Sequence, residues 1–383
     1  IITPISGVSI AFSSLIYGLG ILASAFLLTW AAEAAEKDIT RGLALGFIAI
    51  IAVLPEYAVD FSLAWEAGKD PTYTQYAIAN MTGGNRLLIG IGWPTVMFLR
   101  WLKSRSKGIT LSFSRKPDLI VLLVATLYAL SIPLKGSLSL IDSIFLPSLF
   151  LFYMYILSKS DDDDETEIIG PAASIASISS LKRKLVISTI FLFSAFVIFL
   201  CAEPFAHGLI ETGTKFGLDE FLLIQWIAPL ASEAPEIVVA CILTLRGNGS
   251  SALTILVSSK INQWSLLIGT LPIVYAASIG DFSSMQLDSR QSIEILLTAA
   301  QTFFAFTLLL NLFMSNKSAL ALLLLFTSQI MIPLESARLV FCMVYLIISI
   351  LLLTISKEKR NALFNLRNDF KTALKHKNTF LTR

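Results

Sequence analysis

Two similar stretches, each an apolar run interrupted by polar residues, constrain this chain more than any other feature. The second runs from Pro229 to Pro272 and reads PLASEAPEIVVACILTLRGNGSSALTILVSSKINQWSLLIGTLP. The first runs from Val53 to Pro94 and contains VLPEYAVD followed by NMTGGNRLLIGIGWP. Each copy places Pro-Glu in one hydrophobic segment and Gly, Ser or Asn in the next. This pattern predicts an internal repeat whose unit is a pair of membrane segments.

The composition is typical of a membrane protein. Hydrophobic residues make up 55% of the 383 and charged residues 15%, whereas an ordinary soluble domain carries about 25% charged residues. We therefore expect an all-α polytopic protein in contact with the lipid bilayer. No basic face recurs along any segment, so we expect no nucleic-acid partner. Two histidines, and three cysteines without CxxC spacing, predict neither a zinc site nor a disulfide framework. We expect no cofactor.

Segment length predicts about ten or eleven transmembrane helices, since a helix needs about 20 apolar residues to cross the hydrocarbon layer. Eleven apolar runs lie near 9–31, 42–65, 73–99, 118–135, 138–158, 185–206, 218–245, 251–278, 292–314, 317–333 and 336–356. An acidic, Ser-rich linker, 159–184, carries the run Asp161–Glu165, and residues 357–383 form a basic tail. The predicted domains are two transmembrane halves, 1–158 and 185–356, with this linker between them.

The basic residues predict the orientation of the chain. Lys and Arg gather in 100–116, in 182–184 and in the tail, and such residues stay on the cytoplasmic side. One arrangement satisfies all three segments: the N-terminus outside, the linker and C-terminus in the cytoplasm. We expect a multi-pass protein of the cell membrane. Tryptophans expected in the interfacial belts are Trp30, Trp93, Trp101 and Trp226.

This orientation makes the two repeats inverted with respect to the membrane. The segment that holds Pro55-Glu56 runs from inside to outside, and the one that holds Pro235-Glu236 runs from outside to inside. Inverted repeats with helix-breaking residues at corresponding positions are typical of secondary transporters, whose ion sites lie near the midplane. We therefore expect a transporter and not an enzyme.

The Pro-Glu pairs predict a cation site. A proline frees a backbone carbonyl and can kink the helix, and the carboxylates of Glu56 and Glu236 stand beside these kinks. Hard cations such as Ca²⁺ and Na⁺ take carboxylate, carbonyl and amide oxygens as ligands. Asp60 lies one turn after Glu56, and Ser232 and Glu233 lie one turn before Glu236. The alternative for these acids is a position near a helix end, among lipid headgroups.

The second segment of each repeat offers further oxygens. In the first copy Asn85 is the favoured contributor, after small residues that allow close helix approach. In the second copy the candidate ligands are Ser258, Ser259, Asn262 and Gln263. Gln263 lies 27 residues after its Pro-Glu glutamate and Asn85 lies 29 after its own, so the register of these segments stays open. An interhelical hydrogen bond is the alternative role for Asn85.

Lys260 is an unusual residue for such a segment. A buried ammonium donates hydrogen bonds only and repels a metal cation. It could pair with Glu56, Glu233 or Glu236 in place of the ion, or lose its proton when the ion binds, because burial and nearby cations lower the pKa of a lysine. The alternative is a side chain that extends to the interface. We interpret Lys260 as an ion-coupling switch.

These two stretches resemble the alpha repeats of the calcium/cation antiporter superfamily, which includes the sodium/calcium exchangers. Those repeats pair a Thr/Ser-Ser-x-Pro-Glu kink with a helix rich in Gly, Ser and Asn. Here the pattern stands as AVLPE at 52–56 and SEAPE at 232–236, within repeats of about 42–99 and 218–278. The resemblance implies two inverted halves of five helices, with one extra helix at the C-terminus. It also implies exchange of a cation, often Ca²⁺, against Na⁺ or H⁺ by alternating access. The ligands that it implies are Glu56, Glu236, Asn85 and Gln263, with Ser232, Ser258 and Ser259 nearby.

The chain departs from the family pattern at three places. Ala52 and Val53 stand where the first hydroxyl pair is expected, Glu233 replaces a hydroxyl, and Lys260 stands at or beside an expected Asn. The added acid and the added base leave the site charge similar. Two functions are therefore predicted: a Ca²⁺ antiporter coupled to Na⁺ or H⁺, or alternatively a Na⁺/H⁺ exchanger in which Lys260 replaces one bound cation.

Overall fold

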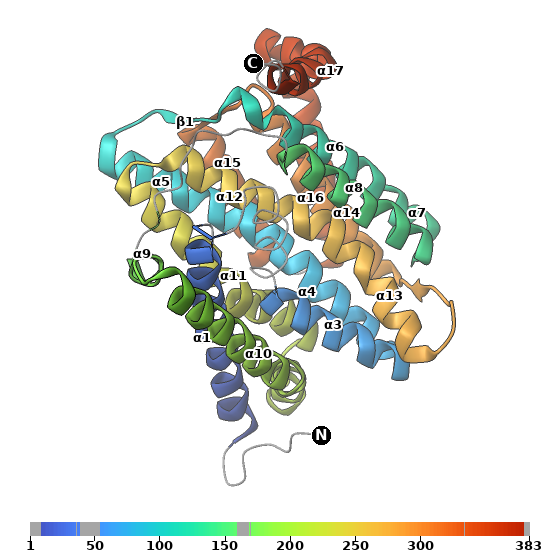
Figure 1. The fold of residues 1–383 in the computed structure, drawn as a ribbon. Helices are drawn as coiled ribbons and strands as arrows, with labels where there is room; N and C mark the ends of the chain where they lie inside the picture. Colours follow the sequence, from blue (N-terminus) through green and yellow to red (C-terminus); the bar gives the residue numbers. More distant parts are fainter. Residues whose placement is uncertain are drawn as a thin grey trace. The chain divides into compact units, whose positions relative to one another are not determined.

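The computed structural model describes residues 9–35, 37, 38, 54–158, 168, 170–332 and 334–378, and these residues are almost entirely helical (Figure 1). Seven helical segments of this described part are long and apolar enough to cross a membrane: Ile10–Ala35, Phe113–Lys135, Leu140–Leu157, Ser180–Phe216, Glu220–Arg246, Ser289–Leu309 and Glu335–Ile355. The prediction of an all-α polytopic membrane protein is confirmed.

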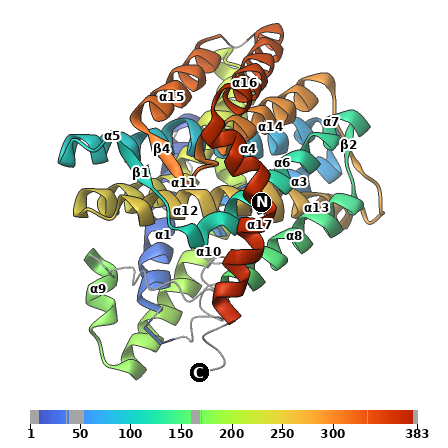
Figure 2. The ribbon, with the colours of Figure 1, turned by 90° about the horizontal axis from the view of Figure 1, so that it is seen from above.

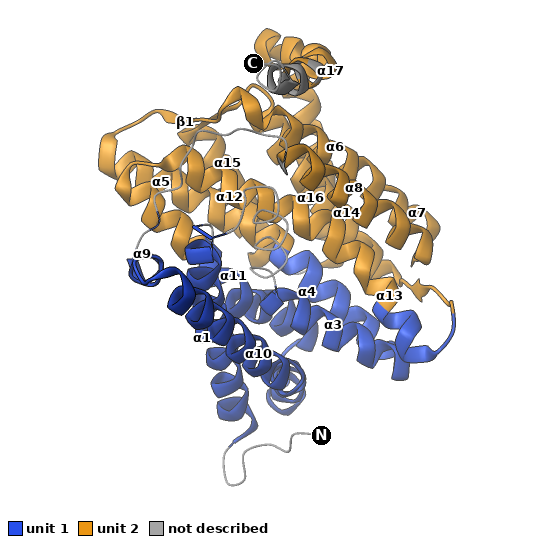
Figure 3. Ribbon diagram, viewed as in Figure 1, with its two compact units in different colours: residues 1–84, 164–236, 274–281 blue, residues 85–163, 237–273, 282–383 orange. Residues whose placement is uncertain are grey.

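The chain forms two compact units, and each takes segments from both parts of the sequence (Figure 3). Unit 1 holds 1–84, 164–236 and 274–281, and unit 2 holds 85–163, 237–273 and 282–383. The divisions fall inside helices, between Gly84 and Asn85 and between Glu236 and Ile237. The units therefore divide the chain differently from the two predicted halves, which stay a prediction.

Unit 1 consists of helices that pack through small residues. Its elements are α1 (Ile10–Ala35), α3 (Leu54–Lys69), η1 (Pro71–Tyr73), α9 (Gly170–Ala176) and α10 (Ser180–Phe216), with the parts of α4 (Thr74–Leu87), α11 (Glu220–Arg246) and α13 (Ile268–Ile279) that fall in its ranges. Helix α1 packs along α10. Gly18 lies against the ring of Phe205, and Ser14 Oγ donates to the Phe205 carbonyl at 3.2 Å.

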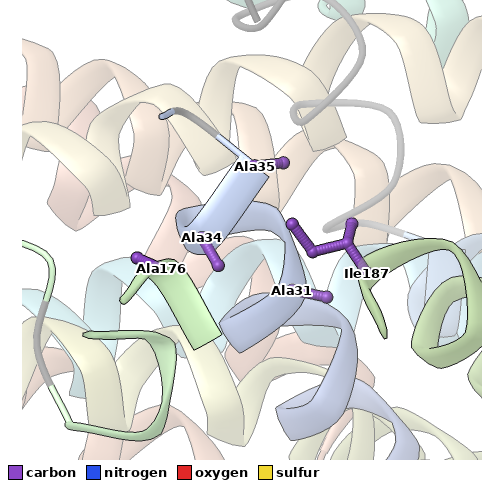
Figure 4. Close-up of a cluster of buried hydrophobic side chains, with 5 residues drawn as sticks. All are labelled: Ala31, Ala34, Ala35, Ala176 and Ile187. Atoms are coloured by element: carbon purple, nitrogen blue, oxygen red, sulfur yellow. The ribbon is translucent and has the colours of Figure 1, made fainter. Parts of the chain in front are cut away.

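Hydrogen bonds of Arg183 join α1, α9 and α10 at one end of the α1–α10 pair. Arg183 Nε donates to Asp38 Oδ2 at 2.6 Å, and Arg183 Nη1 donates to the carbonyls of Ala176 and Ile178 at 3.0 and 2.7 Å. The guanidinium holds the pKa of the Asp38 carboxyl below its ordinary value. The same helices contribute a cluster of buried apolar side chains, Ala31, Ala34, Ala35, Ala176 and Ile187 (Figure 4). The ion pair of Arg183 and the burial of Ala176 therefore hold the end of the predicted linker, 159–184, against α1.

Unit 2 carries most of the remaining helices and four short strands. Besides its parts of α4, α11 and α13, its elements are η2 (Leu88–Gly92), α5 (Trp93–Ser104), β1 (Gly108–Thr110), η3 (Phe113–Arg115), α6 (Lys116–Ala129), α7 (Ser131–Lys135), β2 (Ser137–Leu138), α8 (Leu140–Ser158), α12 (Gly249–Asn262), η4 (Gln263–Leu267), β3 (Met285–Gln286), α14 (Ser289–Leu309), β4 (Phe313–Ser315), α15 (Asn316–Met331), α16 (Glu335–Ile355) and α17 (Lys357–Asn378). Strand β1 pairs antiparallel with β4, and β2 pairs antiparallel with β3. Figure 2 shows β1 and β4 together beside α5 and α15.

The second segment of each repeat is interrupted by a π-helical turn. Helices α4 and α5 are joined through η2, and α12 and α13 are joined through η4. In the first copy the N–H of Trp93 donates to the Leu88 carbonyl, and Pro94 follows at a position that has no N–H to donate. Such turns recur at functional sites. The repeat thus appears in the local backbone as well as in the sequence.

Most predicted spans coincide with helices, and two details are wrong. The span 292–314 ends at Leu309, because residues 313–315 form strand β4 instead. Trp93 is fully buried and is therefore no belt residue, whereas Trp101 is 37% exposed. Residues 42–53 of the first repeat, with Ala52 and Val53, and the acidic run Asp161–Glu165 lie outside the described residues.

A glycine in α4 provides a test of the packing inside unit 1. A Cβ at Gly83 would lie 1.8 Å from the backbone oxygen of Gln225, whereas a Cβ at Gly92 would meet its nearest atom at 3.5 Å. We expect Gly83→Ala to lower the free energy of unfolding by about 1 to 3 kcal/mol, the usual cost of overpacking. Thermal unfolding of the purified protein in detergent measures this. Gly92→Ala is the control, and equal losses in both variants would contradict the packing.

Candidate cation site

The carboxylates predicted from the Pro-Glu pairs lie in unit 1, on α3 and α11. Glu56 stands in the first turn of α3 and is 6% exposed, and Asp60, one turn later, is fully buried. On α11 Glu233 is 2% exposed and Glu236 is half-buried. Ser232 is buried, and its Oγ donates to the Pro229 carbonyl at 3.3 Å. A buried charge in a membrane-spanning helix is costly and usually functional.

Asp60 forms a buried pair with a residue that the sequence analysis did not select. Asn80 Nδ2 on α4 donates to Asp60 Oδ1 at 2.9 Å, and Asn80 is 2% exposed. Within the described ranges, Asp60 Oδ2 and Asn80 Oδ1 are buried oxygens with no hydrogen-bond donor. Buried polar atoms normally have partners. This pair therefore presents two acceptor oxygens of the types that hard cations prefer. The sequence feature that could have identified Asn80 is its amide, at the start of NMTGGN in the second segment of the first repeat.

Glycines in α4 let α11 approach closely within unit 1. A Cβ at Gly84 would lie 3.1 Å from Glu233 Oε1, so the absent side chain makes room for this carboxylate. Gln225, fully buried on α11, donates from Nε2 to Thr82 Oγ1 at 3.5 Å. The small residues of α4 thus bring Glu233 to its surface, as expected of small-residue helix contacts in membranes. Among the residues that the structure covers, no three His, Cys, Asp or Glu side chains gather closely enough to hold a metal ion by themselves.

Lys260 and Asn85 meet inside unit 2. Lys260 Nζ donates to Asn85 Oδ1 at 2.6 Å, approaches the Asn85 carbonyl at 3.5 Å and lies 4.3 Å from the centre of the Trp264 ring. Lys260 and Asn85 are both fully buried, so the ammonium does not extend to an interface. An amide oxygen and an aromatic face are both favourable partners for a cation. They form a small cage around the lysine ammonium.

The other predicted ligands of unit 2 lie around η4. Asn262 and Gln263 are buried where α12 passes into this turn, and Ser259 is buried one turn earlier. Ser258 is half-buried, and its Oγ lies 2.9 Å from the hydroxyl of Tyr153 on α8. The segment therefore gathers hydroxyl and amide oxygens in the interior of unit 2.

A buried triad of charges stands next to Asn85 in the sequence. Arg86 on α4 and Arg338 on α16 both pair with Glu294 on α14, Arg338 Nη1 at 2.6 Å from Glu294 Oε1. All three side chains are at most 5% exposed. Gln301 Nε2 donates to the Arg86 carbonyl at 3.3 Å. The sequence analysis left out Arg338, because its partner lies 44 residues away on a different helix.

Glu294→Gln tests the contribution of this triad to stability. The variant keeps the shape but leaves two guanidiniums in the interior without their carboxylate, and breaking a buried ion pair costs about 3 to 5 kcal/mol. Glu335→Gln, on an exposed side chain of α16, is the matched control. We expect a much lower melting temperature in detergent for the first variant only. Similar melting temperatures for the two variants would show that the triad adds nothing.

The fold and the buried charges define a polytopic helical membrane protein with acids and amides in its helices. Comparison with known proteins agrees with this class. The sodium/calcium exchanger protein family matches residues 9–159 and 187–351. The chain therefore belongs to that family.

Three of the solved structures that are similar to this chain cover most of its length. The H⁺/Ca²⁺ exchanger CAX is 43% identical, with a TM-score of 0.90 over 97% of this chain and 92% of the other. YfkE is 14% identical, with a TM-score of 0.60 over 89% and 93%. The sodium-calcium exchanger NCX_Mj is 15% identical, with a TM-score of 0.55 over 84% and 97%; these two show the fold alone. The curated proteins contain no match.

Proposed function

We propose that this protein is a secondary active antiporter that exchanges Ca²⁺ against Na⁺ or H⁺ by alternating access. The observation that carries the proposal is the buried pair Asp60–Asn80, which presents two acceptor oxygens, with Asp60 one turn after Glu56 on α3. The 43% identity to a protein described as an H⁺/Ca²⁺ exchanger supports the choice of ion. The membrane is the cell membrane, with the linker and the C-terminus in the cytoplasm.

The proposed ligands in each unit are chosen from that unit's own contacts. In unit 1 they are Glu56, Asp60, Ser232, Glu233 and Glu236, to which the structure adds Asn80. In unit 2 they are Asn85, Ser258, Ser259, Asn262 and Gln263. Within unit 1, the carboxylates with the Ser232 hydroxyl and the Asn80 amide oxygen make a mixed oxygen set of the kind that Ca²⁺ binds. The carboxylates also supply groups that protons or Na⁺ can occupy when Ca²⁺ leaves.

Lys260 has a specific place in this scheme. Its ammonium already occupies the Asn85 side-chain oxygen at 2.6 Å, so it acts as a tethered monovalent cation. A transported cation that uses Asn85 has to displace it. This contact supports the role of Lys260 as an ion-coupling switch. It is also the reason to retain Na⁺/H⁺ exchange as the second outcome of the flux experiment.

Flux in proteoliposomes tests the proposal. We expect Ca²⁺ to move against an imposed Na⁺ or pH gradient, and Glu56→Gln and Glu236→Gln to slow it at least about tenfold. Losing one charged ligand costs more than about 1.4 kcal/mol, which is tenfold in affinity. Glu66→Gln is the control, since Glu66 lies on the same helix α3 and pairs with Lys69 at the surface. Flux of Na⁺ and H⁺ without Ca²⁺ would replace the proposal with its alternative.

Lys260→Asn tests the switch. Removing the ammonium frees the Asn85 oxygen and removes a charge that repels cations, so we expect the KM for Ca²⁺ to fall at least about fivefold. Lys116→Asn is the matched control, because Lys116 is also buried but donates to the Leu310 carbonyl at 3.1 Å. An unchanged KM and unchanged coupling to pH in Lys260→Asn would rule out the switch.

A further inference from the structure

A groove on the surface of unit 2 lies between α5 and α15, and no part of the proposed transport uses it. Its volume is about 230 Å³, and its walls include Met97, Phe98 and Trp101 of α5 and Asn316, Ala319 and Leu323 of α15. Met97 and Ala319 are buried, whereas Phe98, Trp101 and Leu323 are 56%, 37% and 37% exposed. Figure 2 shows the two helices beside β4. The groove is therefore apolar and open along one side. Its volume is smaller than the roughly 300 to 1,000 Å³ of drug-sized pockets.

Three basic residues lie close to one end of the groove, in contact with its lining residues or adjacent to them in the backbone. Arg105 lies over the Trp101 ring, 4.6 Å from its centre. Lys317 follows Asn316 in the chain, and the Lys107 carbonyl accepts the N–H of Asn316 at 3.1 Å. Arg105, Lys107 and Lys317 are all exposed. In the part of the chain that the structure describes, none of the three forms an ion pair with an acid. The end is thus a positive patch beside an aromatic ring.

The start of α15 adds to the attraction for anions at this end. Ser315 caps the helix and accepts from the Ser318 N–H, so Asn316 and Lys317 form its first turn. The N–H groups of a first turn carry partial positive charge and favour a phosphate or a carboxylate. An apolar slot that ends at Trp, Arg and Lys has the arrangement of a membrane interface, where aromatic and basic side chains meet lipid headgroups.

We propose that this groove binds an anionic phospholipid, with one acyl chain between α5 and α15 and the phosphate at Arg105, Lys107 and Lys317. A second copy of this chain fits the groove less well. A two-fold interface centred here would place the same patch on both partners and bring the three cations of each copy together. The proposal stands independently of which ions the protein transports.

Native mass spectrometry of the delipidated full chain tests the site. The probes are phosphatidylglycerol and phosphatidylcholine with the same acyl chains, and the readout is the lipid retained per protein. We expect phosphatidylglycerol to be retained preferentially. The double variant Lys107→Gln/Lys317→Gln should reduce its retention about twenty-five-fold, that is, fivefold for each cation near a lipid surface. Added salt should weaken retention as well.

Two matched controls keep the result specific. Lys182→Gln/Lys184→Gln removes two exposed charges from α10 and should leave retention unchanged. Leu323→Trp fills the groove and should reduce retention of both lipids, whereas Leu324→Trp, on an exposed neighbour outside the groove, should not. Equal retention of the two lipids, or an equal effect of the two lysine pairs, would overturn the proposal. A dimer that Leu323→Trp converts to a monomer would overturn it too, because a second copy would then cover the groove.

Discussion

Every charge inside a membrane-spanning helix needs a partner, and this requirement shapes both units. Glu294 is the clearest example, because it receives guanidiniums from α4 and α16 while fully buried on α14. The cost of an unpaired charge at this depth ties these three helices together more specifically than apolar packing can, since lipid tails and leucines are equally apolar. The ion pair with Glu294 fixes the position of Arg86, and its neighbour Asn85 belongs to the same turn of α4.

The two units, each described by itself, differ in the balance of their buried charges. Among the described residues, unit 1 buries three carboxylates and one cation, Arg183, whereas unit 2 buries four cations and three acids. The carboxylates of unit 1 are those of Glu56, Asp60 and Glu233. The cations of unit 2 are Arg86, Lys116, Lys260 and Arg338, and its acids are Asp118, Asp142 and Glu294. Acids that accept amide hydrogens, such as Asp60, can exchange a proton for a metal ion. Buried cations held by Asn85 or Glu294 cannot bind a metal. The proposed carboxylate ligands therefore all lie on α3 and α11.

The sequence was sufficient for the class of protein, for most spans and for the residues of the repeat, because apolar length and Pro-Glu spacing are local signals. It was not sufficient for the partners of the polar residues. Arg86 and Glu294 are 208 residues apart and Lys260 and Asn85 are 175 apart, and only the packing of helices joins them. Asn80 was passed over for the same reason, since nothing near it in the chain marks it as the partner of Asp60. The end of α14 at Leu309 depends on the pairing of β4 with β1, which is also non-local.

The π-helical turns give the register that the sequence left open. Leu88 begins η2 three residues after Asn85, and Gln263 begins η4 three residues after Lys260. By this register Asn85 corresponds to Lys260, rather than to Gln263, and the two corresponding residues bond to each other. Two asparagines at these positions could both present oxygens to a cation. With a lysine at one of them, the repeat supplies its own positive charge to the other, and the ammonium of Lys260 donates a hydrogen bond to the amide oxygen of Asn85.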